Sequence, residues 1–397
     1  MKTNWDFVSL GSVALIYNGN SINAEYKKKH FLGVDKGYPF IATKDVGFNG
    51  FIDYENGVKI PFDTDYKVAD SDSVFICAEG GSAGKKIGYI TQQVCFGNKL
   101  FCIKPKQNIL KGKYIYYYLQ SVFFQIQFQS LLTGLIGGVS ASKFKNISIP
   151  VPPLSEQERI VSLLDLEFAK IDAIKANAEK QLQDAKDLFQ SALKDLLTPK
   201  EGWVEKSLKE IGKTQTGCTP SMSNKDFYNE NYIPFVKPAE INYDGVGGIN
   251  YKTQMLSKLG AKKGRIFKSD SIFMVCIGAT IGKLGISNRD ISCNQQINVL
   301  TPDEFYYSRF VYYAMLNPLF NNVVVSEGTS AQATLPIISK GKWELLKVKI
   351  PPYFEQQIIA NRLDLLQNKI KKLQSNYEQT ITLCNDLKQS ILKDIFG

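Results

Sequence analysis

The chain of 397 residues has a single histidine, His30, and seven cysteines without a Cys-x-x-Cys pair. This set cannot supply a Cys/His zinc site of the usual spacing. A Gly-x-Gly-x-x-Gly cofactor loop and a nucleophile elbow are missing, and a catalytic triad would depend on His30 alone. We also recognise no carboxylate–lysine nuclease pattern. The sequence therefore predicts a protein with no catalytic residues and no metal site.

Long hydrophobic runs are missing as well. Residues 1–6 lack the apolar stretch of a secretory signal, and the most apolar segment, 272–286, is interrupted by glycines and Lys283. A membrane-spanning helix needs about 20 consecutive apolar residues. We therefore expect a soluble, cytoplasmic protein whose thiols are reduced.

The most informative feature present is a repeat. Segments 152–198 and 351–397 align at an offset of 199, and 19 of their 47 positions are identical. The stretches ahead of them match more loosely, for example Trp5 with Trp203 and Pro39-Phe40 with Pro234-Phe235. A period of half the chain indicates two copies of one large unit. The predicted order is a globule (1–150), a helix (151–200), a second globule (201–349) and a second helix (350–397).

Both repeated segments have the apolar spacing of a heptad seam. The seam comprises Ile160, Leu164, Ile171, Ile174, Phe189 and Leu196 in the first copy, and Ile359, Leu363, Ile370, Leu373, Ile391 and Ile395 in the second. The simplest partner for each helix is the other copy, and an antiparallel pair would hold the two globules apart. Alternatively, each helix packs on its own globule, and partner proteins could bind the exposed faces.

The start of each helix is marked by Pro-Pro, which cannot lie inside a helix. Ser155 and Glu158 have the spacing of a capping box, in which two side chains satisfy the first backbone N–H groups. In the second copy Phe354 and Gln357 replace them, so we expect that helix to begin less sharply.

The globules mix short β-rich runs, such as 73–77 and 271–275, with one aromatic-rich helix each, around 114–128 and 305–320. We expect these aromatics to form the core rather than to stack on bases. The predicted fold class is therefore α/β with mixed α+β character.

The net charge of +10 is unevenly distributed. The helical segments 155–200 and 355–397 together carry −1, which leaves +11 on the globules. This is either a generic basic surface or a phosphate-binding footprint, since clustered Lys and Arg release counterions when they bind nucleic acid.

Two aligned turns could approach a DNA backbone. Gly80–Lys86 and Gly278–Lys283 resemble phosphate loops, but their spacing is short by one and no Ser or Thr follows the Lys. Further on, Gly97-Asn98-Lys99 aligns with Asn294-Gln295-Gln296. Amides can read adenine and Lys can reach guanine or phosphate, although such a turn can equally hydrogen-bond its own backbone.

The segment Ile350-Pro351-Pro352-Tyr353 is similar to the Asn/Asp-Pro-Pro-Tyr motif of amino-methyltransferases. Ile350 stands where the motif needs a polar side chain, so nothing there would hold a target amine. We interpret the segment as a helix start.

Two basic globules alternating with two matching helices, each introduced by Pro-Pro-x-x-Glu-Gln, resemble the specificity subunit of type I restriction-modification systems. The segments that carry the resemblance are 149–157 and 350–356. It implies that each globule is a target-recognition domain reading one half of a bipartite, asymmetric DNA site. The helices would be spacers between the half-sites and docking surfaces for two methyltransferase subunits.

The resemblance also implies that catalysis and cofactors belong to other chains. S-adenosylmethionine would bind the methyltransferase subunits, and ATP and Mg²⁺ would serve a restriction subunit. The candidate DNA contacts are Lys44, Lys85, Lys86, Asn98, Lys99, Ser140, Ser142, Lys143, Lys237, Thr280, Lys283, Asn294, Gln295, Gln296, Ser330 and Gln332. Alternatives are the recognition subunit of a type IIB-like enzyme, a coiled-coil scaffold that does not bind DNA, and an autonomous methyltransferase.

Overall fold

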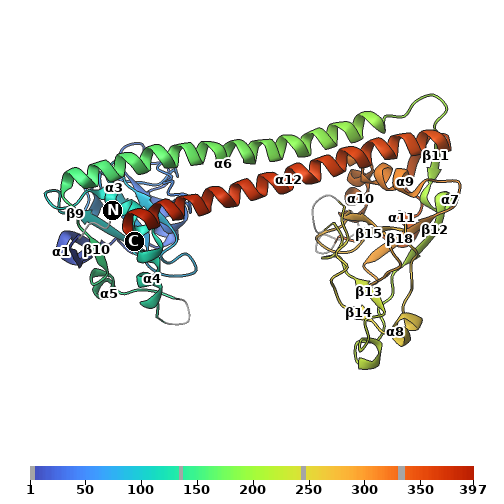
Figure 1. Cartoon of the computed structure of the whole chain (residues 1–397), viewed down its shortest axis with the longest axis horizontal. Coiled ribbons are helices and arrows are strands. Elements are labelled where there is room, and N and C mark those ends of the chain that lie inside the picture. Colours follow the sequence, from blue (N-terminus) through green and yellow to red (C-terminus); the bar gives the residue numbers. More distant parts are fainter. Residues whose placement is uncertain (1–4, 134–136, 243–246, 330–335) are drawn as a thin grey trace. The chain divides into compact units, whose positions relative to one another are not determined.

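A computed structural model of the chain describes residues 5–133, 137–242, 247–329 and 336–397. The chain divides into two compact units, Met1–Ala178 with Gln379–Gly397, and Glu179–Glu378. The long helices α6 (Leu154–Leu196) and α12 (Tyr353–Phe396) are therefore each divided between the two units. Both ends of the chain belong to the first unit, as Figure 1 shows.

In the described residues of the first unit, an antiparallel sheet and a smaller mixed sheet form the globule. The antiparallel sheet has the order β2 (Ala14–Asn18), β9 (Leu100–Pro105), β6 (Val74–Cys77), β7 (Ile87–Tyr89). The mixed sheet has the order β4 (Lys59–Ile60), β3 (Tyr38–Ile41), β8 (Val94–Phe96), β5 (Val68–Ala69), with β3 and β8 parallel. The remaining elements are β1 (Phe7–Ser9) paired with β10 (Ser148–Pro150), α1 (Leu10–Val13), α2 (Ala24–His30), η1 (Thr43–Asp45), α3 (Gly112–Leu119), α4 (Val122–Ser130) and α5 (Ala141–Lys145).

The second unit repeats this topology. Its antiparallel sheet has the order β12 (Gly212–Thr216), β18 (Ile297–Pro302), β15 (Ile272–Val275), β16 (Leu284–Ile286). Its smaller sheet has the order β14 (Met255–Leu256), β13 (Ile233–Val236), β17 (Ser292–Cys293), with β13 and β17 parallel. The remaining elements are β11 (Val204–Ser207) paired with β19 (Lys347–Ile350), α7 (Leu208–Ile211), η2 (Lys225–Phe227), α8 (Lys258–Lys263), α9 (Ser308–Leu316), α10 (Pro318–Thr329) and α11 (Lys340–Trp343). The mixed fold and the internal repeat predicted from the sequence are confirmed.

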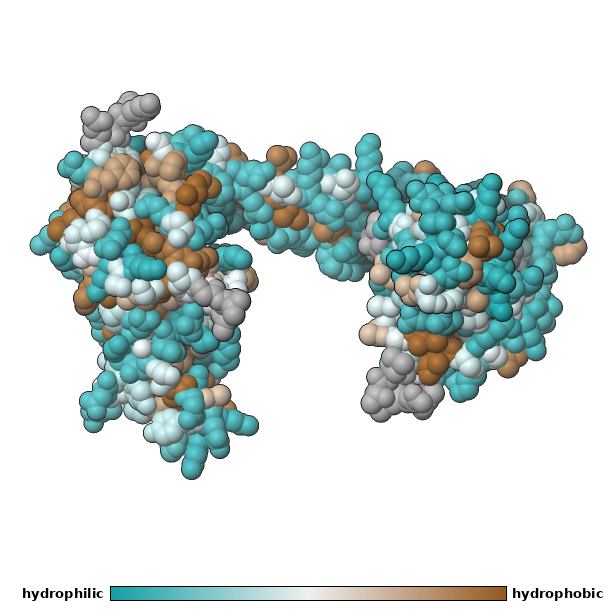
Figure 2. All heavy atoms as spheres, turned by 90° about the horizontal axis from the view of Figure 1, so that it is seen from below, coloured by the Kyte–Doolittle hydropathy of each residue, from teal (hydrophilic) through white to brown (hydrophobic). Residues whose placement is uncertain are grey.

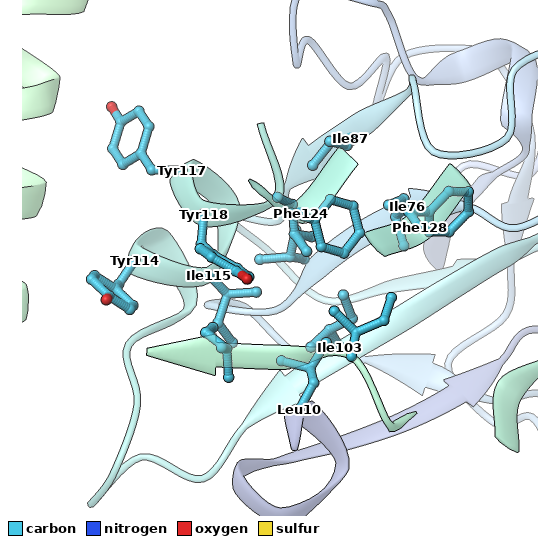
Figure 3. Packing of buried hydrophobic residues seen from close by; sticks show 14 of the residues in the cluster. Leu10, Ile76, Ile87, Ile103, Tyr114, Ile115, Tyr117, Tyr118, Phe124 and Phe128 are labelled. Carbon is cyan, nitrogen blue, oxygen red and sulfur yellow. The ribbon is translucent and has the colours of Figure 1, made fainter. Parts of the chain in front are cut away.

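The aromatic residues fill the core, as predicted. Figure 3 shows side chains of α3 and α4, among them Ile115, Phe124 and Phe128, converging on Ile76 and Ile103 of the sheet. The predicted single aromatic helix is in fact two in each repeat. The first repeat breaks at Ser121, whose hydroxyl caps α4 by accepting the Phe124 N–H, and the second breaks before Pro318, which cannot lie in a helix interior.

The two long helices pair antiparallel within each unit, which confirms the predicted coiled coil. In the first unit Lys388 Nζ lies 2.6 Å from Asp172 Oδ1, and Lys175 Nζ lies 3.2 Å from Asn385 Oδ1. Because the residue numbers along α12 fall as those along α6 rise, the two helices run in opposite directions. In the second unit the same core cluster holds Phe189, Leu193, Ile359, Leu363 and Ile370.

Two residues of the predicted seam are wrong: Ile174 is 53% exposed and Leu373 is 40% exposed. At the helix ends the buried residues are Leu193 and Leu197, and their repeat equivalents Leu392 and Phe396. The predicted Leu196, Ile391 and Ile395 are partly buried at the edge of these clusters. The physical reason is that each helix end also packs on a globule: the Phe396 ring lies 5.5 Å from that of Tyr114.

The Pro-Pro-x-x-Glu-Gln motif has a structural explanation. Gln157 is fully buried; its Nε2 donates to Ile109 O at 2.9 Å, and its Oε1 accepts the Lys111 N–H at 3.0 Å. The equivalent Gln356 accepts the Tyr307 N–H at 2.8 Å. A buried amide with satisfied donors and acceptors fixes the first turn of each helix to its globule.

The capping-box interpretation of Ser155 and Glu158 is wrong. The helix begins at Leu154, so Ser155 lies inside the first turn. Glu158 instead forms an ion pair with Lys111 at 2.8 Å. In both copies the carbonyl of the second proline accepts the first helical N–H groups, from Gln157 at 3.0 Å and from Gln356 at 3.1 Å, so the second helix begins as sharply as the first.

None of the described helices is long and apolar enough to cross a membrane. The face of the molecule in Figure 2 is mostly hydrophilic, with separate hydrophobic patches on both units and along the helices.

Candidate DNA interface

Four segments that contain the candidate DNA contacts of the first unit are joined by backbone hydrogen bonds. The Ala78 N–H donates to Lys99 O at 2.8 Å, which connects the turn 80–86 to the turn 97–99. The Val139 N–H donates to Ala78 O at 3.0 Å and brings in the segment before α5. The Gly97 N–H donates to Ile41 O at 2.9 Å, which adds the strand end before Lys44.

The second unit makes the same connections at aligned positions. The Cys276 N–H donates to Gln296 O at 2.8 Å, the Ile338 N–H to Cys276 O at 3.0 Å, and the Asn294 N–H to Val236 O at 3.1 Å. The fold therefore brings together segments that are spread along much of each globule's sequence, from Ile41 to Val139 in the first unit and from Val236 to Ile338 in the second. Each globule holds one such four-segment surface.

In the first unit the candidate lysines differ in their exposure and in the groups that they contact. The Lys44 side chain is 78% exposed and 4.0 Å from Asp45, and Lys99 is 62% exposed and 3.3 Å from Glu79. Lys85 is exposed, whereas Lys86 is half-buried and donates to Thr43 O at 2.9 Å. Exposed ion pairs of this kind contribute little to stability, so Asp45 and Glu79 hold the Lys44 and Lys99 ammonium groups only weakly.

In the second unit Gln295 is the amide that projects outward. It is exposed, and its Oε1 accepts the hydroxyl of Thr219 at 2.5 Å. Asn294 is buried, and its amide donates to Gln296 Oε1 at 2.8 Å. Asn294 therefore holds the turn together, and Gln295 is the amide of this turn that stays exposed.

The other candidates of the second unit lie around this turn. Lys237 is half-buried and donates to Gln254 Oε1 at 3.0 Å. Thr280 is exposed, and the half-buried Lys283 lines a cavity of about 220 Å³ with Asn242 and Asn321.

The small polar candidates before α5 have a local structural role. The Ser140 hydroxyl caps α5 by accepting the Lys143 N–H at 3.4 Å, and it lies 3.0 Å from the Ser142 hydroxyl. Asn98 is exposed, and its carbonyl accepts the Asn18 side chain at 2.9 Å. Ser330 and Gln332 lie outside the described residues.

Sequence reasoning missed a fifth segment, the turns at Gly19 and Gly217. A Cβ at Gly19 would lie 2.0 Å from Phe96 O, and one at Gly217 would lie 2.1 Å from Asn294 O. Only glycine allows the backbone to approach the recognition turn this closely. The matching Gly at these two aligned positions was the signal that could have identified the segment.

The Cys77 thiol lies buried beside this surface. Burial raises the pKa of Cys77, and the opposing effects of the Glu79 backbone, Thr43 and Lys86 do not reverse the shift. A thiol held protonated is a poor nucleophile and a poor metal ligand. Among the residues that the structure describes, no group of three or more His, Cys, Asp and Glu is arranged to hold a metal ion.

Comparison with known proteins identifies the family. The model of the type I restriction modification DNA specificity domain matches residues 2–184 and again residues 200–383. The chain therefore belongs to this family and contains two such domains. The two matches coincide with the two repeats.

Similar curated proteins are specificity subunits of type I restriction enzymes. The HindI subunit of Haemophilus influenzae is 27% identical over 196 residues, an alignment that covers 49% of this chain and 39% of that protein. The EcoBI subunit of Escherichia coli is 23% identical and aligns over 99% of this chain and 85% of its own length. The StySPI subunit of Salmonella potsdam is 24% identical, with coverages of 100% and 89%.

Two solved structures share the fold. A chain from a study of complex assembly and conformational transition of the type I R-M system superposes with a TM-score of 0.77 at 19% identity, covering 99% of this chain and 97% of that one. The HsdS subunit from Thermoanaerobacter tengcongensis gives a TM-score of 0.55, also at 19% identity, with coverages of 100% and 97%.

Proposed function

We propose that this chain is the DNA-recognition subunit of a type I restriction-modification complex and that it reads a bipartite, asymmetric DNA site. Each globule reads one half-site through its four-segment surface. The observation that carries the proposal is the duplication of this surface with different side chains, Asn98-Lys99 in one copy and Gln295-Gln296 in the other. Because amides and lysines prefer different base edges, the two half-sites differ in sequence.

The long helices serve as docking surfaces for two methyltransferase subunits. Large apolar side chains are exposed at three pairs of repeat-equivalent positions: Leu166 and Leu365 at 56% and 60%, Ile174 and Leu373 at 53% and 40%, and Leu188 and Leu387 at 57% and 51%. Exposed apolar residues that recur at the same positions of a duplicated helix indicate a protein interface used twice. Two identical partners fit this duplication.

Catalysis and cofactors are assigned to the partner chains. S-adenosylmethionine binds the methyltransferase subunits, and ATP and Mg²⁺ serve the restriction subunits that join them. This chain contributes positioning: it holds the duplex through phosphate and base contacts and presents the target base to its partner.

Three alternatives lead to different measurements. A type IIB-like enzyme would combine modification and cleavage in one partner chain, so its neighbouring genes would lack a separate ATP-dependent motor subunit. A coiled-coil scaffold would not bind DNA at all. An autonomous methyltransferase would require the purified chain to bind S-adenosylmethionine by itself.

Methylation mapping tests the proposal. A host genome carrying this gene and its neighbours is sequenced for modified adenine, beside a strain in which only this gene is deleted. The expected result is a split, asymmetric motif that disappears in the deletion strain. Binding of a duplex with this motif to the reconstituted complex should weaken steeply with salt, because phosphate contacts release counterions. An unchanged methylation pattern after the deletion contradicts the proposal.

A further inference from the structure

Two exposed phenylalanines lie at the tip of a hairpin beside the recognition surface of the first globule. Phe48 is 70% exposed and Phe51 is 63% exposed. The base of the hairpin is anchored, since Val46 and Ile52 pair with each other and are both buried in the core. The tip thus projects from a fixed base, and its two aromatic rings contribute little to the core.

The tip itself is held in one conformation. The Gly47 N–H donates to Phe51 O at 2.8 Å, and Asn49 Oδ1 accepts the Phe51 N–H at 3.2 Å. Gly50 has φ +83°, and a Cβ there would lie 2.0 Å from the Tyr116 hydroxyl oxygen. Only glycine fits a left-handed backbone at such close approach. A rigid tip loses little conformational entropy when it binds.

One lysine contacts the Phe48 ring. Lys86 Nζ lies 5.2 Å from the centroid of the Phe48 ring while it donates to Thr43 O, so it connects the tip to the turn that carries Lys44. Lys85 is exposed beside it. Neither Lys85 nor Lys86 makes an ion pair with any of the described residues. Within the described part of the chain, both ammonium groups bond only to backbone carbonyls, of Thr43 and Gly81. An aromatic tip beside lysines that no carboxylate neutralises is complementary to a nucleic acid, which offers stacked bases between phosphates.

We propose that Phe48 and Phe51 form an apolar wedge that stacks on, or enters, a base step in the half-site read by the first globule. Lys44, Lys85 and Lys86 neutralise the phosphates on either side. The inference rests on the proposed function. It means that this hairpin distinguishes DNA sequences by how easily a base step is deformed. Pyrimidine–purine steps unstack most easily, and apolar wedges between base steps are a known way to kink a duplex. The wedge therefore favours a flexible step at the position it contacts.

A third exposed phenylalanine provides a matched control. Phe62 is 61% exposed in the same unit, but its ring packs edge-on against Tyr38 with centroids 4.9 Å apart. Scattered surface phenylalanines are ordinary in soluble proteins. A substitution at Phe62 therefore measures the effect of losing any exposed ring.

The test uses the full chain with its methyltransferase subunits and a duplex carrying the motif obtained by methylation mapping. 2-Aminopurine replaces each purine of the motif in turn, and its fluorescence reports local unstacking. Methyltransferases flip their target base out of the duplex, so the methylated adenines are left out of the comparison. At the remaining purines the wild-type complex should enhance fluorescence at one step of one half-site. The double variant Phe48→Ser/Phe51→Ser should lose this enhancement and bind the motif roughly 5- to 100-fold more weakly. Phe62→Ser should behave like the wild type.

The outcomes separate the two levels of the proposal. If the wild type binds the motif specifically and the double variant matches it in affinity and fluorescence, the wedge is overturned and the proposed function stands. A wild type without specific binding overturns both. If the double variant has a lowered melting temperature or fails to assemble with its partners, the tip has a structural role and the wedge is again overturned.

Discussion

The hydroxyl of Tyr313 in α9 donates a hydrogen bond of 2.5 Å to the carboxylate of Asp364 in α12. At the equivalent place in the first repeat, the hydroxyl of Tyr117 in α3 donates a hydrogen bond to Asp165 in α6. A cation reinforces each pair, Arg309 on Asp364 and Lys113 on Asp165. Burial and the bond to Asp364 raise the pKa of Tyr313. Two repeats with few identical residues in their globules thus attach helix to globule through the same chemistry.

Substituting Tyr313 by Phe should destabilise the second unit by roughly 1–2 kcal/mol, because the Asp364 carboxylate loses a buried hydrogen-bond donor. Chemical unfolding of the full chain measures the loss. Tyr353→Phe removes the hydroxyl of a residue that is 43% exposed at the start of α12, and it should leave stability unchanged. Equal stability of Tyr313→Phe and the wild type would show that Arg309 alone satisfies the carboxylate.

Leu197→Phe should stabilise the second unit. In the first unit the equivalent Phe396 packs against Tyr114 and Tyr118, whereas Leu197 lines an apolar cavity of about 280 Å³ with Trp203, Ala314 and Phe320. Filling such a space commonly adds about 0.5–2 kcal/mol. The melting temperature should rise for Leu197→Phe and stay constant for Leu188→Phe, at an exposed position of the same helix. A lower melting temperature would mean that the cavity cannot accommodate the ring.

Gln295→Ala should relax or abolish recognition at one half-site while leaving the complex assembled. Losing one good amide–base contact costs about 1–3 kcal/mol of discrimination, or roughly a 5- to 100-fold change. Adenine methylation of randomised half-site libraries by the reconstituted complex gives the readout. Asn294→Ala, which removes the buried amide beneath the turn, should instead lower stability. Loss of subunit assembly in Gln295→Ala would argue for a structural role.

Glu210→Gln should remove a pH-dependent contribution to stability. Hydrogen bonds from the Ser207 hydroxyl and N–H lower the pKa of Glu210 from 4.5 to about 2. A carboxylate with a depressed folded-state pKa stabilises the fold above its unfolded value, and this contribution is lost as the pH falls through the folded value. Melting curves of wild type and variant should therefore differ at pH 7 and converge between pH 4.5 and 2. The same difference at pH 3 and pH 7 would rule out the carboxylate as its source.

Several features followed from the sequence because they depend on local pattern. The offset of 199 residues fixed the number of units, the heptad spacing predicted the paired helices, and short β-rich runs located strands such as β6 and β15. The candidate turns at 97–99 and 294–296 were found because they align between the copies. The surface that each turn forms with other segments of its own globule could not be read from the sequence, since the hydrogen bonds that join these segments connect residues far apart in the chain.

The sequence by itself determined the duplicated architecture, the helix starts at Pro-Pro and the concentration of positive charge on the globules. Only the tertiary structure decided which amide points outward, Gln295 rather than Asn294, and which apolar residues of the helices are left uncovered, such as Ile174 and Leu373. Periodicity defines a helix face but not its partner. Which of its apolar residues are covered depends on contacts with the other helix and with the globule, and no local pattern contains those contacts.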